Sequence, residues 1–103
     1  MLNQIVLVGR LVKNVEKGDK YMTLACPRSF KNAEGNYDTD FIDIKLSNYI
    51  SQSTMEYCKK GDVIGVIGRI ESLSVDDGDG HYIKKMEIVA DRVTYLAAHK
   101  GGE

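Results

Sequence analysis

Short apolar runs separated by polar turns constrain the fold of this chain more than any other feature of its sequence. Residues 4–13 and 21–27 form two such runs, and residues 62–73 and 81–96 form two longer ones joined by the turn Asp76-Asp77-Gly78-Asp79-Gly80. Runs of this length bounded by Gly, Asn and Asp are typical of β-strands. We therefore predict a fold built mainly from strands.

A fifth run, residues 40–46, alternates strictly between two kinds of side chain. Ile42, Ile44 and Leu46 share one face, which we expect to point into the core. Phe41 and Lys45 then share the other face. A phenylalanine on the polar face of a strand adds little to stability, so its position indicates binding. The preceding residues 28–39 are polar, and we predict a long hairpin loop there.

Helical spacing occurs only in residues 48–60. Ser47 can cap the start of this helix, Gly61 can end it, and its predicted apolar face consists of Ile50, Thr54, Tyr57 and Cys58. Three strands, a helix and two strands follow the β-β-β-α-β-β order of the OB-fold, a five-stranded Greek-key barrel. We expect an all-β fold, with residues 1–97 forming one domain and residues 98–103 a short disordered tail.

Composition limits the class of protein. A chain of 103 residues suffices for one domain with a single core. Its 43% hydrophobic and 28% charged residues are typical of a globular, water-soluble chain. It contains no 18-residue apolar run, and no basic stretch and apolar core follow Met1, so we expect neither a membrane span nor a signal peptide. A cytoplasmic, nucleoid-associated location follows.

The sequence offers no catalytic or metal-binding motif. Cys26 and Cys58 lie far apart, and we expect two reduced, buried thiols rather than a disulfide or a metal site. His81 and His99 are isolated, without the partners that nucleophilic or metal-assisted catalysis needs. We expect no enzyme activity and no cofactor.

The net charge of −1 excludes an indiscriminate polycation, but the charges are unevenly distributed. Residues 1–31 carry six basic and two acidic side chains. Such segregation permits a basic face on a nearly neutral protein, although an ordinary mixed surface is the alternative. Within this region Phe30 lies between Arg28 and Lys31. Aromatic side chains in a basic groove hold single-stranded nucleic acid by stacking on its bases.

The order of several motifs resembles the DNA-binding domain of bacterial single-stranded DNA-binding proteins. The resemblance covers nearly the whole chain and rests on Gly9-Arg10, Asp40-Phe41-Ile42, Lys60-Gly61, residues 65–70 and residues 87–91. It implies that Phe30 and Phe41 stack on bases and that Arg10 and Arg69 are basic positions on the same surface. The alternatives are that Phe30 folds back onto the barrel, that Phe41 belongs to an interface or second core, and that both arginines are merely solvated.

The resemblance also implies weaker candidate residues, and this chain departs from the family pattern at several positions. Other candidate DNA-binding residues are Arg28, Lys31, Lys45, Tyr82 and Lys85, although exposed lysines often serve only solubility. Ser47 and Val75 occupy two positions that are usually aromatic in the family, so each subunit should bind more weakly unless Tyr49 or Tyr82 substitutes. The chain ends at Gly101-Gly102-Glu103 without the family's acidic tip, so we expect no recruitment of repair and replication enzymes by that route.

Two functions of different classes remain open. The first is sequence-independent binding and protection of single-stranded DNA in replication, recombination or repair. The second is an OB-fold protein-contact module of primosome or phage accessory type, with weak or lost DNA binding. Residues 5–8 are apolar on both faces of the first strand and make a poor lone edge, which predicts a homo-oligomer. The resemblance implies a tetramer; a dimer is the alternative.

Overall fold

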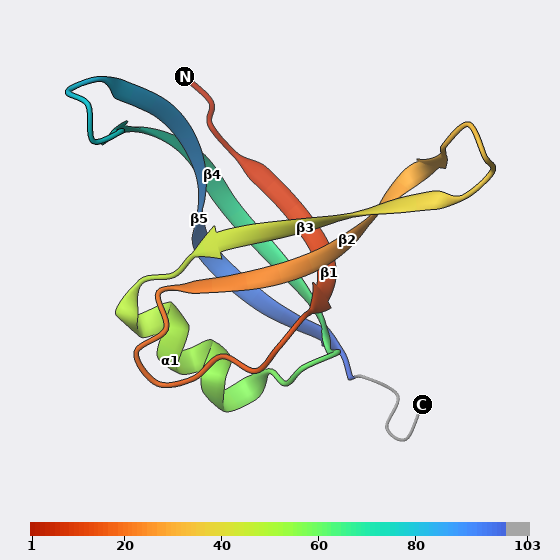
Figure 1. The fold of residues 1–103 in the computed structure, drawn as a ribbon. Coiled ribbons are helices and arrows are strands. Elements are labelled where there is room, and N and C mark those ends of the chain that lie inside the picture. Colours follow the sequence, from red (N-terminus) through yellow and green to blue (C-terminus); the bar gives the residue numbers. More distant parts are fainter. Residues whose placement is uncertain (99–103) are drawn as a thin grey trace.

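Five strands close into a barrel in the computed structural model, which describes residues 1–98 (Figure 1). Around the barrel the strand order is β1-β2-β3-β5-β4, and the helix connects β3 to β4. This confirms the predicted all-β OB-fold barrel with one short helix. The elements are β1 (Ile5–Leu11), β2 (Tyr21–Lys31), β3 (Tyr37–Lys45), α1 (Asn48–Tyr57), β4 (Val63–Asp76) and β5 (Tyr82–Ala97).

Aliphatic side chains from alternate strand positions fill the barrel. Leu24, Ile44, Ile64 and Val66 are fully buried, and Ile42 packs against them while partly exposed. The predicted alternation in β3 is confirmed, because Phe41 on the opposite face is 68% exposed. Since successive side chains of a strand point to opposite faces, every second residue of this strand is available to a ligand.

Two short strand pairings, here called seams, close the barrel. Strand β1 pairs with β4 along Ile5–Arg10 but with β2 only where Arg10 and Leu11 meet Ala25 and Leu24. Strand β3 pairs in parallel with β5 only where Ile44 and Lys45 meet Ile88 and Val89. The barrel therefore consists of two sub-sheets, the β2–β3 hairpin and the β1–β4–β5 sheet, which meet along these seams.

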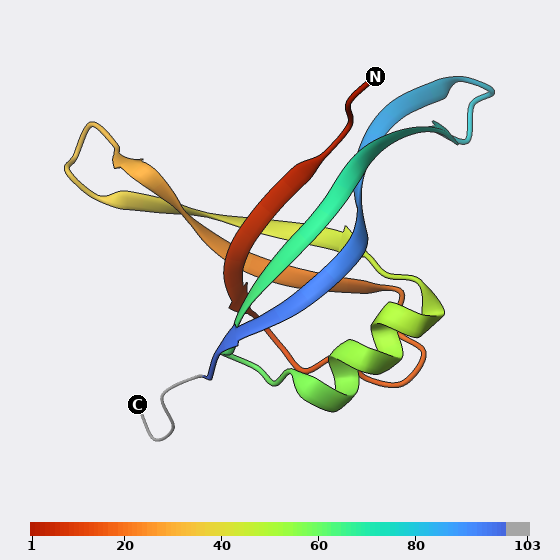
Figure 2. The ribbon, with the colours of Figure 1, turned by 180° about the vertical axis from the view of Figure 1, so that it is seen from behind.

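Both hairpins extend beyond the barrel as arms. In residues 26–40, the β2–β3 arm, and residues 70–87, the β4–β5 arm, the strands pair only with each other. Both arms leave the same end of the barrel (Figures 1 and 2). The prediction of a loop over residues 28–39 is wrong for most of that segment, because β2 continues to Lys31 and β3 begins at Tyr37. A register shift between Pro27 and Lys31 lets the pairing continue past the proline.

Helix α1 covers the other end of the barrel (Figure 2). Ser47 caps its start, since its Oγ accepts a hydrogen bond from the Ile50 amide at 3.2 Å. The helix ends at Tyr57 rather than at residue 60, because Cys58 is already extended. Gly61, with a φ of 89°, belongs to the following turn. Tyr57 was expected on the apolar face but is 71% exposed.

The remaining sequence expectations concern the barrel surface. Val6 and Val8 of β1 point outward and are exposed, whereas Ile5 and Leu7 are half-buried, so β1 is apolar on both faces as predicted.

Cys26 is half-buried and Cys58 is buried. Both are free thiols, and burial raises the pKa of each. Within residues 1–98 no helix is long and apolar enough to cross a membrane. Most of the predicted tail, residues 99–103, lies outside the described residues.

Candidate nucleic-acid interface

Strand register places two of the leading candidates from the sequence in one row. Arg10 of β1 is opposite Ala25 of β2, which is in turn opposite Phe41 of β3. Residues opposite each other on neighbouring strands point to the same side of a sheet. Arg10 and Phe41 therefore share the outer face of β1–β2–β3, where both are exposed. The outer face of strands 2 and 3 is the surface with which OB-folds bind oligonucleotides.

A second row crosses the other seam. Tyr21 is opposite Lys45, Lys45 is opposite Val89, and Val89 is opposite Arg69. The Tyr21 hydroxyl donates to Glu87 Oε1 at 2.5 Å, and this hydrogen bond raises the pKa of the tyrosine. Lys45 Nζ lies 3.8 Å from the other oxygen of Glu87. The lysine expected to meet phosphate thus faces a carboxylate of β5.

Carboxylates also hold two of the three candidate arginines. Arg69 donates to Glu71 at 2.7 Å and to Asp91, and the hydrogen bond to Glu71 is the main reason that its pKa is raised. Arg28 donates through Nε and Nη2 to the two oxygens of Asp40, at 3.0 Å each. These bonds lower the pKa of Asp40 and raise that of Arg28.

Arg10 is different from these three cations. Its Nη1 donates to the backbone carbonyl of Gly61 at 2.9 Å, and no carboxylate of the described residues pairs with it. A carbonyl orients the guanidinium without neutralising it. Arg10 is therefore the basic residue beside Phe41 that keeps its full charge available to a phosphate.

The arms carry the remaining candidates. On the β2–β3 arm, Phe30 is 63% exposed and the Lys31 ammonium lies 5.9 Å from the ring centre of Tyr37, a cation–π distance. Tyr82, 72% exposed, begins β5 on the other arm. A hollow of about 510 Å³ at the base of this arm is lined by Lys85, Leu73 and Tyr21, among others. The candidates thus surround an extended surface rather than a closed pocket.

Sequence reasoning missed two aromatic residues of this surface. Tyr37 is 57% exposed. It lies four positions before Phe41 in β3, so the two side chains point to the same side of the strand. Tyr21 is 47% exposed in the second row. The alternation that placed Phe41 outward extends to Tyr37 once the strand is known to begin there. The assignment of residues 28–39 to a loop hid that signal.

The two departures from the family pattern have structural roles here. Ser47 caps α1, as described above. Val75 is opposite Ile83 on the β4–β5 arm, where it is half-buried. Neither residue offers a ring to a base, so the aromatic candidates described so far lie in the two rows and on the two arms.

Comparisons with known proteins agree with this geometry. Residues 2–96 match the model of the single-strand binding protein family. Single-stranded DNA-binding protein B of Bacillus subtilis is 36% identical over 93% of this chain and 91% of its own length. Single-stranded DNA-binding protein 2 of Staphylococcus aureus is 37% identical over 93% of this chain and 74% of its own.

A solved structure supports the fold independently of sequence. The Plasmodium falciparum SSB complex with ssDNA aligns with 93% of this chain and 96% of that chain, with a TM-score of 0.69 and 20% identity. At that identity the likeness concerns the fold. Because the family match extends over both rows and both arms, the chain belongs to the single-strand binding protein family.

Proposed function

We propose that this chain binds single-stranded DNA independently of sequence and protects it in replication, recombination or repair. The observation that carries the proposal is the row Arg10–Ala25–Phe41, in which an exposed ring and a cation without a carboxylate partner share one face of the sheet. Relatives that cover most of the chain are named single-stranded DNA-binding proteins. The role is binding rather than catalysis, and it places the protein in the cytoplasm, with the nucleoid.

Stacking supplies affinity without sequence preference. Every base has an aromatic face, so a ring such as Phe41 or Phe30 accepts any of them, at about 1–3 kcal/mol per stacked base. Both rings are more than 60% exposed, so neither is needed to fill the core. In a duplex the faces of the bases are covered by their own neighbours. The surface therefore favours single strands over duplex DNA.

The unpaired part of β1 supports a homo-oligomer. Residues 5–9 pair with β4 on one side, but β2 meets this strand only from Arg10 onward. Val6 and Val8 add exposed apolar side chains to the same segment. An unpaired strand edge with apolar side chains is commonly covered by a second chain. We propose a tetramer, with a dimer as the smaller alternative.

Fluorescence anisotropy with a labelled oligo-dT and a duplex of equal length, each at two salt concentrations, tests the function. The single strand should bind far more tightly, and its affinity should fall as salt rises, because phosphate contacts release counterions. Equal affinity for both DNAs would overturn the proposal. A flat response to salt would favour the protein-contact alternative.

A pair of variants tests the stacking role. Phe41→Ala should cost about 1–3 kcal/mol of affinity for oligo-dT and leave the melting temperature nearly unchanged. Tyr95→Ala removes an aromatic residue that is 46% exposed near the end of β5 and belongs to neither row, and it should bind like the wild type. A lower melting temperature with unchanged affinity in Phe41→Ala would assign this residue to an interface or a second core.

A further inference from the structure

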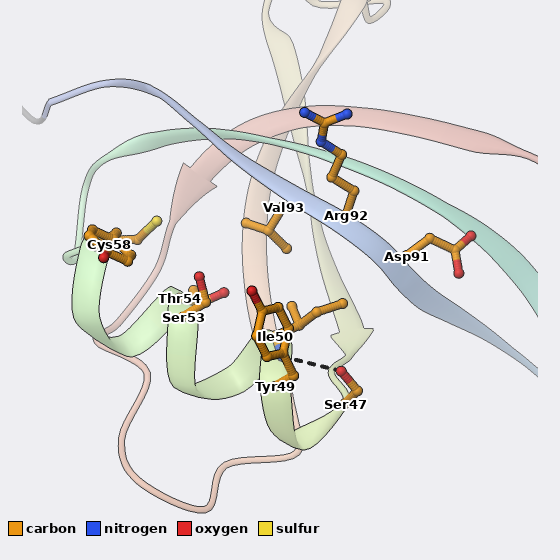
Figure 3. Close-up of a pocket in the computed structure, with 10 residues that line it drawn as sticks. Ser47, Tyr49, Ile50, Ser53, Thr54, Cys58, Asp91, Arg92 and Val93 are labelled. Carbon is orange, nitrogen blue, oxygen red and sulfur yellow. Dashed lines mark hydrogen bonds between the residues drawn. The ribbon is translucent and has the colours of Figure 1, made fainter.

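A groove between α1 and β5 lies beyond both rows of the interface. It has a volume of about 380 Å³ and is lined from the helix by Tyr49, Thr54 and Tyr57 and from the strand by Asp91, Arg92 and Val93. Figure 3 shows Ser47 and Tyr49 at one end of this groove and Cys58 at the other. Nothing in the function proposed above uses it.

One buried hydroxyl in the groove lacks a partner. Thr54 is 2% exposed, and its Oγ1 has no hydrogen-bond partner among the described residues. A buried polar atom without a partner is unfavourable, since it has lost water and gained nothing in exchange. Figure 3 shows this side chain on the side of α1 that faces β5. A ligand with a hydrogen-bonding edge would satisfy it.

Two tyrosine rings lie along the groove. Tyr49 is 83% exposed and Tyr57 is 71% exposed, although both line it. They are eight residues apart on the helix, which places them about 12 Å apart along its axis. The charged ends of the strand residues do not add to the site, because Figure 3 shows the guanidinium of Arg92 pointing away from α1 and Asp91 is held by Arg69. An aromatic surface and a hydroxyl suit a base and its polar edge.

The groove is continuous with the interface. Lys45 of the second row is followed after one residue by Ser47, which lines the groove. Asp91 lines the groove and also binds Arg69 of the same row. The end of the groove that holds Ser47 and Tyr49 is therefore the end next to the second row.

From this continuity we infer that the α1–β5 groove binds a nucleobase of the bound single strand, with Tyr49 as the stacking ring and Thr54 Oγ1 as a hydrogen-bond partner of the base edge. The inference rests on the proposed function. It extends the DNA path from the β-sheet surface onto the helix, and it supplies an aromatic contact close to Ser47, where the chain has no ring.

Three variants test this site with oligo-dT as the probe. Tyr49→Ala should weaken binding roughly 5- to 150-fold, while Tyr49→Phe should bind like the wild type because stacking needs only the ring. Thr54→Val, which keeps the shape of the side chain, should weaken binding roughly 2- to 12-fold. It should also leave the melting temperature equal or higher, because an unpartnered hydroxyl is removed. Tyr95→Ala serves as the control.

A direct contact can be measured as well. Oligo-dT carrying 5-iodouracil should cross-link to Tyr49 or Tyr57 on irradiation, and mass spectrometry of the peptides identifies the residue. If the wild type fails to bind oligo-dT, the proposed function itself is wrong. If Phe41→Ala weakens binding while Tyr49→Ala and Thr54→Val bind like the wild type and no cross-link reaches α1, only the groove assignment is overturned.

Discussion

The ion pair between Arg28 and Asp40 makes the substitution Asp40→Asn informative. Asp40 holds the guanidinium of Arg28 through two hydrogen bonds of 3.0 Å on the β2–β3 arm, and Arg28 lies two residues before Phe30. While this pair is intact, the charge of Arg28 is largely neutralised. Asparagine keeps the size of the side chain but removes its charge. Arg28 then becomes available to a phosphate, and we expect tighter binding of single strands.

The gain follows from counterion release. Each phosphate contact with a single strand steepens the plot of log affinity against log salt by about 0.7. If the added contact contributes nothing at 1 M salt, the same slope gives a gain of about fivefold at 0.1 M and about twofold at 0.3 M. Asp38 remains 3.9 Å from Arg28, so the double variant Asp38→Asn/Asp40→Asn should show the full change and Asp40→Asn a part of it.

Anisotropy titrations with oligo-dT at four or more salt concentrations measure both slope and gain. Glu34→Gln is the matched control, because it removes one negative charge from the same hairpin at a residue whose side chain pairs with no cation of the described chain. It should leave the slope unchanged. An unchanged slope in the double variant, or an equal effect of Glu34→Gln, would refute the reasoning that Arg28 is held back by its carboxylates.

Other predictions concern stability. Gly68→Ala should destabilise the barrel by about 1–3 kcal/mol, because its Cβ would collide with the backbone carbonyl of Val89, whereas the Cβ of Gly65→Ala makes only ordinary contacts of 3.4 Å or more and this variant should melt like the wild type. Ser47→Ala should lower stability by about 1 kcal/mol through loss of the helix cap, as thermal melting would show. The lowered pKa of Asp40 implies that its pair stabilises the fold above the ordinary aspartate pKa and less as the pH falls through the lowered value. Acid unfolding followed by circular dichroism should therefore depend less on pH in Asp40→Asn.

The sequence predicted the barrel because its strands carry local signals. Alternation placed Ile44 inward and Phe41 outward, and both orientations are confirmed. The β2–β3 arm was predicted as a loop because its strands are mostly polar and cover no core. Pairing with each other across a shifted register, rather than burial, makes those residues extended. The pattern of hydrophobic residues along the sequence does not indicate such pairing.

The ion pairs of the interface could not be predicted from the sequence either. Arg28 and Asp40 are twelve residues apart, and Arg69 and Asp91 are further apart still. A count of charges along the chain shows a basic N-terminal third, but the fold brings acids from later strands next to those bases. Only the fold determines that Arg28 and Arg69 are paired with carboxylates while Arg10 is not.

The two seams of the barrel link DNA binding to the stability of the fold. One row of the interface crosses from Arg10 to Ala25 and the other from Lys45 to Val89, which are the same pairs that join the two sub-sheets. A DNA strand lying along either row therefore spans a joint between halves that could otherwise separate by losing few hydrogen bonds. A ligand that binds only the closed barrel disfavours its opening. Bound DNA therefore stabilises the two short strand pairings that close the barrel. The amides of the seams, rather than those of the long β4–β5 hairpin, are where hydrogen exchange should slow most when DNA binds.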